Sequence, residues 1–160
     1  MTQSMIAPMG SARASRISSL VTEVLRGSPL IISRPRTSRD SSSFISLEEP
    51  ISIAGQERRW LCLRHRCFDP SMAPPGKSAA EVWYPTSYEY WQELARDRAQ
   101  YESEKRRIAD VTIAALDKRW PGFASQVEVV DVATPMTYVR HTGNWKGSPD
   151  GWYITPENMM

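Results

Sequence analysis

The strongest constraint on the fold is a helical pattern with firm boundaries at both ends. Thr86 or Ser87 can cap its start, and the pattern runs to about Arg119, where Pro121-Gly122 ends it. In its second half, residues recur three and four positions apart, at Ile108, Val111, Thr112, Ala115 and Leu116. This spacing predicts a stripe that faces a core.

The first half of the helical pattern, residues 89–105, is heavily charged. Its apolar anchors are Trp91, Leu94 and Tyr101. We interpret the charged stretch at residues 96–107 as a solvated helix face.

Short stretches typical of strands lie on both sides of this helix. Residues 51–53 and 59–66 predict two strands joined by a turn around Gly55-Gln56, which makes a hairpin. Residues 79–84 predict a third strand, and residues 126–133 a β-branched fourth. Together the elements predict an α+β fold, with a small mixed or antiparallel sheet and one long or broken helix.

The structured part is expected over residues 44–160, because every Trp and Tyr lies beyond residue 59. Residues 1–43 hold eleven Ser and six Arg against Glu23 and Asp40, a net charge of +4. Such a composition buries too little apolar surface to offset chain entropy, so we expect a mostly disordered tail. A weak amphipathic helical stretch is predicted at residues 17–25. An Arg- and Ser-rich start is also typical of a transit peptide, and that alternative stays open.

Charge and cysteine content narrow the class of protein. The chain as a whole carries +2, so the part after residue 43 is near neutral and predicts no nucleic-acid partner. A targeting or nucleic-acid role for the basic tail is the least supported hypothesis. Two cysteines are too few for a disulfide scaffold and favour a reducing, cytoplasmic compartment. No apolar stretch approaches the roughly 18–20 residues that cross a bilayer, while a peripheral membrane contact stays an alternative.

Two apparent motifs carry no site. Cys62, His65 and Cys67 lie close together, but a structural zinc site needs four ligands and the other histidine is His141. Residues 62 and 65 of one strand also lie on opposite faces, which disfavours a Cys–His nucleophile pair, so no metal is expected. The segment Gly76-Lys77-Ser78 lacks the glycine that a P-loop has five positions earlier, because position 71 is Ser.

A longer set of motifs resembles a known family. Residues 127–148, VEVVDVATPMTYVRHTGNWKGS, are followed by Gly151-Trp152. Residues 68–78 read FDPSMAPPGKS, and Tyr90-Trp91, Leu94, Tyr101, Glu104-Lys105 and Ile108 follow in order. In one collinear arrangement over roughly residues 45–160, these motifs resemble the C-terminal part of the phytoene desaturase, carotenoid isomerase and retinol saturase group of FAD-dependent oxidoreductases.

The resemblance implies a partial substrate domain of a flavin amine-oxidase-like fold. The intact enzymes of this family perform redox chemistry on an apolar, polyene-type substrate. The group holds the FAD pyrophosphate on a Gly-x-Gly-x-x-Gly turn and the helix that follows it. No two of the eight glycines in this chain are separated by one residue, so the turn is absent. We therefore expect a partial copy, inactive alone and without bound FAD, and whether the chain is itself an enzyme stays open.

The resemblance also places residues 134–152 at the junction of flavin and substrate. The cofactor-binding residues that it implies are Arg140, Gly143, Asn144, Trp145, Gly147, Ser148, Gly151 and Trp152. Glycine would allow close approach to a flat ligand, and Arg140, Asn144 and Lys146 could donate hydrogen bonds. An ordinary glycine-rich turn packed by two Trp is the alternative, and no catalytic residue is identified.

Two hypotheses follow from the resemblance. The first is the substrate side of an FAD-dependent oxidoreductase, whose partner is an apolar small molecule. The second is a non-catalytic binding module, or half of a split flavoprotein that needs a complementary FAD-binding chain.

Overall fold

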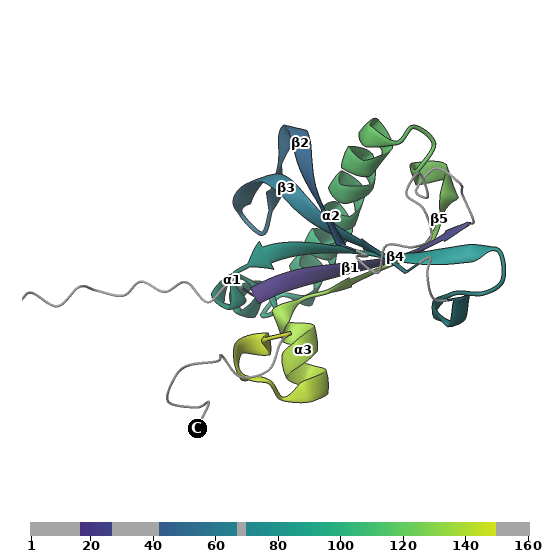
Figure 1. The fold of residues 1–160 in the computed structure, drawn as a ribbon. Helices are drawn as coiled ribbons and strands as arrows, with labels where there is room; N and C mark the ends of the chain where they lie inside the picture. Colours follow the sequence, from purple (N-terminus) through teal and green to yellow (C-terminus); the bar gives the residue numbers. More distant parts are fainter. Residues whose placement is uncertain (1–16, 27–41, 67–69, 150–160) are drawn as a thin grey trace, which may run out of the picture.

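The computed structural model describes residues 17–26, 42–66 and 70–149 of the 160-residue chain. They form a five-stranded sheet, with the strand order β2-β3-β4-β1-β5 and every neighbouring pair antiparallel (Figure 1). The strands are β1 (Ile17–Arg26), β2 (Ser42–Ile53), β3 (Gln56–His65), β4 (Lys77–Thr86) and β5 (Val127–Ala133). The predicted α+β class with an antiparallel sheet is confirmed.

The β2–β3 hairpin forms where the sequence predicts it. Its turn residues, Ala54 and Gly55, both have positive φ angles, of 49° and 72°. Two left-handed residues match the right-handed twist of the strands that a two-residue turn connects. β2 is an edge strand, and its register with β3 shifts between Ser46 and Ile51, where the strand bulges.

The residues of the long helical pattern form two helices, which confirms the broken form of the two that were predicted. α1 (Tyr88–Leu94) begins after Ser87, whose hydroxyl accepts a hydrogen bond from the Tyr90 N–H at 3.3 Å. Asp97 then caps α2 (Arg98–Arg119), because its carboxylate accepts the N–H groups of Ala99 and Gln100 at 2.9 and 3.1 Å.

The core lies between α2 and one face of the sheet. From α2 it takes a buried stripe of Ile108, Ala109, Thr112 and Leu116. From the sheet and its flanks it takes Ile53, Leu61, Leu63, Ala80, Val82, Tyr84, Trp91, Phe123 and Val132. Two buried hydrogen bonds cross it: Tyr84 Oη to Thr112 Oγ1 at 3.1 Å, and Trp91 Nε1 to Thr86 Oγ1 at 2.8 Å. The predicted core stripe of the helix is therefore largely confirmed.

β1 corrects one expectation. Residues 17–26 form a strand inside the sheet, so the predicted amphipathic helix over residues 17–25 is wrong. Pairing with β4 on one side and β5 on the other overrides the local spacing. The remainder of the leader up to residue 41 lies outside the described residues. A transit peptide cleaved after residue 26 would remove this strand from the sheet.

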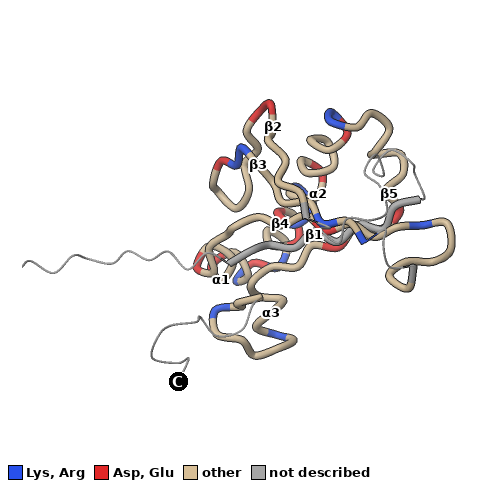
Figure 2. The backbone as a smooth tube through the Cα atoms, in the orientation of Figure 1, with Lys and Arg blue, Asp and Glu red and all other residues tan. Residues whose placement is uncertain are grey.

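The segment after β5 contains a short helix that was not predicted from the sequence. This helix, α3 (Pro135–Thr142), precedes Gly143. Figure 1 shows α3 and α1 near the same end of the sheet, where β4 and β5 end. Among the described residues, no helix is long and apolar enough to cross a membrane. Figure 2 shows Lys and Arg interspersed with Asp and Glu along the described chain.

Candidate functional site

The C-terminal segment, residues 134–148, is held in place by its own caps. Thr134 is fully buried, and its N–H donates to Thr137 Oγ1 at 3.1 Å. Pro135 occupies the first turn of α3, where a missing N–H costs nothing. Gly143 ends the helix with a φ of 69°, in the left-handed conformation that glycine adopts freely. A Thr-Pro start and a glycine stop are sequence signals for a short helix, and the glycine-rich interpretation overlooked them.

Gly147 allows the chain to fold back against α3. The short 3-10 turn η4 (Trp145–Gly147) places Gly147 in a buried position with a φ of 63°. A Cβ atom there would lie 2.6 Å from the Cα of Pro135, which is too close for any side chain. Asn144 Nδ2 donates to the carbonyl of Ser148 at 2.9 Å and closes the same turn. These three predicted residues therefore meet within the chain, and their contact with a flavin stays a prediction.

Lys146 connects the C-terminal segment to α1. Its Nζ lies 2.5 Å from Glu89 Oε1 and 5.1 Å from the centroid of the Trp145 ring. The Lys146 ammonium lowers the pKa of Glu89 to about 2, with help from the Glu89 backbone and the Ser87 hydroxyl. Trp145 itself is 76% exposed, so the segment presents a large apolar ring to solvent.

The other predicted residues are less closely associated. Arg140 is exposed on α3, and its Nη2 lies 3.1 Å from His141 Nε2. Gly143 is exposed at the end of the helix. Gly151 and Trp152 lie outside the described residues.

An aromatic face on the sheet was not identified from the sequence. We use this name for Phe44, Trp60, Arg64 and Trp83, which lie on the side of β2, β3 and β4 opposite the core. The Phe44 and Trp60 rings meet edge to face with centroids 5.5 Å apart, and the Arg64 guanidinium lies 4.4 Å from the Trp83 ring centroid. Phe44 is 76% exposed and Trp60 42%. Exposed apolar side chains gathered in this way are typical of a binding surface.

Hydrogen bonds order the charged groups beside the aromatic face. Glu81 accepts two hydrogen bonds from Arg66 Nη2, at 3.0 and 2.9 Å, and one from Trp83 Nε1 at 3.3 Å. Arg64 Nε is buried and has no hydrogen-bond partner among the described residues. The Arg64 guanidinium stacks on the Trp83 ring.

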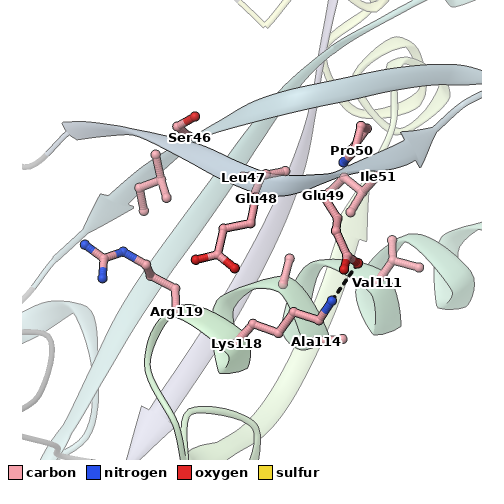
Figure 3. A pocket seen from close by; sticks show the side chains of 12 residues that line it. Ser46, Leu47, Glu48, Glu49, Pro50, Ile51, Val111, Ala114, Lys118 and Arg119 are labelled. Atoms are coloured by element: carbon pink, nitrogen blue, oxygen red, sulfur yellow. Dashed lines mark hydrogen bonds and ion pairs between the residues drawn. The ribbon is translucent and has the colours of Figure 1, made fainter.

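A groove lies on the other side of the molecule, between the bulge of β2 and the last turns of α2 (Figure 3). Its apolar lining comes from Ile45, Leu47, Ile51, Val111, Ala114 and Ala115. At its rim Lys118 Nζ pairs with Glu49 at 2.7 Å and lowers the pKa of Glu49. Its volume of about 220 Å³ is below the roughly 300–1,000 Å³ of ordinary ligand pockets, so the groove fits a side chain better than a whole polyene.

In the part of the chain that the structure describes, no group of three or more His, Cys, Asp or Glu side chains could hold a metal ion. Cys62 is buried, and Cys67 lies outside the described residues. The perturbed carboxylates serve ion pairs and caps: Arg107, for example, lowers the pKa of Glu104 through hydrogen bonds at 2.7 and 2.8 Å.

The described part of the chain does not fit the pyrophosphate of FAD. That group requires free N–H groups at a helix N-terminus that follows a parallel strand. Here the sheet is antiparallel, and side chains of the chain itself occupy the helix starts, namely Ser87 at α1, Asp97 at α2 and Thr137 at α3.

Comparison with known proteins gives one consistent result. The chain is similar to prolycopene isomerase. It is 31% identical over 97 residues to the chloroplastic prolycopene isomerase of Daucus carota, which is 58% of this chain and 15% of that protein. The chloroplastic prolycopene isomerase of Arabidopsis thaliana is 32% identical over 97 residues, 58% of this chain and 16% of its own length. No family profile matches the chain.

The chain thus spans about one sixth of the relatives that it matches. Prolycopene isomerase is a carotenoid isomerase, so the similarity supports the suspected carotenoid-related oxidoreductase family at a coarse level. Both relatives are named as chloroplastic, whereas the two-cysteine composition favoured the cytoplasm.

Proposed function

We propose that this chain is a substrate-side module of a carotenoid-related, FAD-dependent oxidoreductase, and that it binds a linear polyene. The observation that carries the proposal is the 31% identity to prolycopene isomerase over 58% of the chain. The flavin, which would supply the redox chemistry, is proposed to be held by a polypeptide region other than the described one. A plastid location, as the relatives' names have it, replaces the cytoplasmic expectation in this proposal.

The aromatic face and Trp145 are the proposed polyene contacts. A polyene is long, flat and apolar, and it gains most from large apolar rings that lie at the surface before it binds. Phe44 and Trp145 are each 76% exposed, and Trp60 is 42% exposed. The chain's own role would be to hold the polyene and shield it from water, because no acid or base is assigned.

Binding of prolycopene to the full chain tests the proposal. Prolycopene in non-ionic detergent should quench Trp fluorescence and acquire a circular dichroism signal in its visible band. The double variant Phe44→Ala and Trp60→Ala should weaken both signals about tenfold, because it removes two exposed rings.

Met72→Ala is the matched control. Met72 is 47% exposed, close to the value for Trp60, but it lies in the connection between β3 and β4. Equal weakening by Met72→Ala would indicate partition into any exposed apolar surface. No induced dichroism in the wild-type chain would refute polyene binding.

A further inference from the structure

The strand β1 lies between two strands that follow it in the sequence. It is the first described element, yet it lies between β4 and β5, which come after it. All ten of its residues pair with β4, from Ile17 opposite Thr86 to Arg26 opposite Lys77, and residues 20–25 pair with β5. We name the space between β4 and β5 the slot. We propose that the slot is a binding site for an extended peptide and that β1 is its exchangeable occupant.

The helix α2 contacts both walls of the slot. Tyr84 of β4 is hydrogen-bonded to Thr112 of α2, with 3.1 Å between their hydroxyl oxygens. Thr134, directly after β5, is hydrogen-bonded to Tyr101 of α2 at 2.6 Å, and both Tyr84 and Thr134 are fully buried. Since one helix is hydrogen-bonded to both walls, it limits their separation when β1 leaves.

An ion pair joins the two walls directly. Lys77 at the start of β4 pairs with Glu128 of β5. In register, Arg26 lies opposite Lys77 and Leu25 opposite Val127, so the pair spans the end of β1. This contact also limits the separation of the walls.

The sequence of β1 is poorly matched to the slot. Ser19 lies opposite Tyr84, and Glu23 lies opposite Ala80. Both β4 residues are buried, at 0% and 1% exposed. Neither Ser nor Glu is among the β-branched and aromatic residues that stabilise strands, so residues 17–26 are a weak strand sequence for this register.

The fitting partner is therefore an extended segment of about ten residues, antiparallel to both walls, with β-branched residues opposite Tyr84 and Ala80. It would gain main-chain hydrogen bonds from β4 and β5 together, and its alternate side chains would set specificity. Peptide binding in the slot does not depend on a flavin or a polyene.

A labelled peptide tests the proposal on the full chain. It has the sequence of residues 17–26 with Ser19→Val and Glu23→Val. We expect saturable binding by fluorescence anisotropy, about tenfold or more tighter than for the unsubstituted peptide. Hydrogen exchange should show that β1 amides lose protection while β4 and β5 amides keep theirs. A peptide with its alternation shifted by one residue should not bind.

A matched protein variant supplies the second readout. In the full chain with Ser19→Val and Glu23→Val, β1 should pair more strongly in the slot and compete better with the peptide. The affinity of the labelled peptide for this variant should therefore be lower than for the wild type by a factor of about ten or more. Absence of binding to the wild type, or binding with β1 amides still protected, would overturn the proposal. A wild-type dimer with exchanged β1 strands would also overturn it, because the second occupant of the slot would then be another copy of the chain.

Discussion

Replacing Gly147 by Ala should detach η4 from the start of α3. The new Cβ would lie 2.6 Å from the Cα of Pro135, and backbone in the first turn of a helix has little freedom to move aside. The φ of 63° adds about 1–2 kcal/mol of strain for a residue with a side chain. Overpacking typically adds about 1–3 kcal/mol. We expect Gly147→Ala to lower the free energy of unfolding by about 2–5 kcal/mol.

Gly143→Ala is the matched control. Its φ of 69° imposes the same strain, but a Cβ there meets nothing within 4 Å. It should therefore cost only about 1–2 kcal/mol. Urea unfolding followed by far-ultraviolet circular dichroism would measure both losses, and their difference isolates the overlap with Pro135. Equal losses would refute the reasoning, and so would an undiminished stability of Gly147→Ala.

Three further predictions follow. The pKa of Glu89, measured by NMR, should be about 2 and should rise towards its ordinary value in Lys146→Met. In the wild type, the ion pair contributes fully to the stability of the fold above about pH 4.5, and this contribution is lost as the pH falls towards 2. Tyr84→Phe and Thr112→Val should each cost about 1–2 kcal/mol in denaturant unfolding, and the double variant should cost less than their sum, whereas additive losses would show that the hydroxyls do not interact. The purified chain should lack flavin absorbance, because its described helix starts are occupied by its own side chains, and a stoichiometric flavin after gel filtration would contradict this.

Elements with local signals were predictable from the sequence. The β2–β3 hairpin follows from Gly55 and the flanking strand-like runs, and the boundaries of the helical region follow from Ser87 and Pro121-Gly122. The break before α2 also has a local cause, because Asp97 competes for the N–H groups of the next turn. In each case the deciding contacts lie within a few residues.

β1 was not predictable in this way. Residues 17–25 fit a helical spacing, and nothing nearby in the sequence opposes a helix. Their conformation is decided by pairing with β4 and β5, which lie more than 50 and 100 residues further along the chain. Local patterns carry no information about a partner so distant.

The candidate site was only partly accessible from sequence. The stretch at residues 134–148 was selected through the family resemblance, and contact between its glycines and a ligand stays a prediction. The close approach of Gly147 to the backbone of Pro135 was not predicted. The aromatic face needed knowledge of register. Trp60 and Arg64 share a face of one predicted strand, but Phe44 and Trp83 join them only once β2 and β4 are paired.

The position of β1 also has a consequence for biosynthesis. The ribosome releases this strand long before β5, whose first residue, Val127, is synthesised about a hundred residues after Arg26. At translation rates of about 5–20 residues per second, β1 waits roughly 5–20 s for its second neighbour. During that interval β1 lacks at least one of its two neighbours, and holdase chaperones that bind extended segments would meet it before the sheet can close.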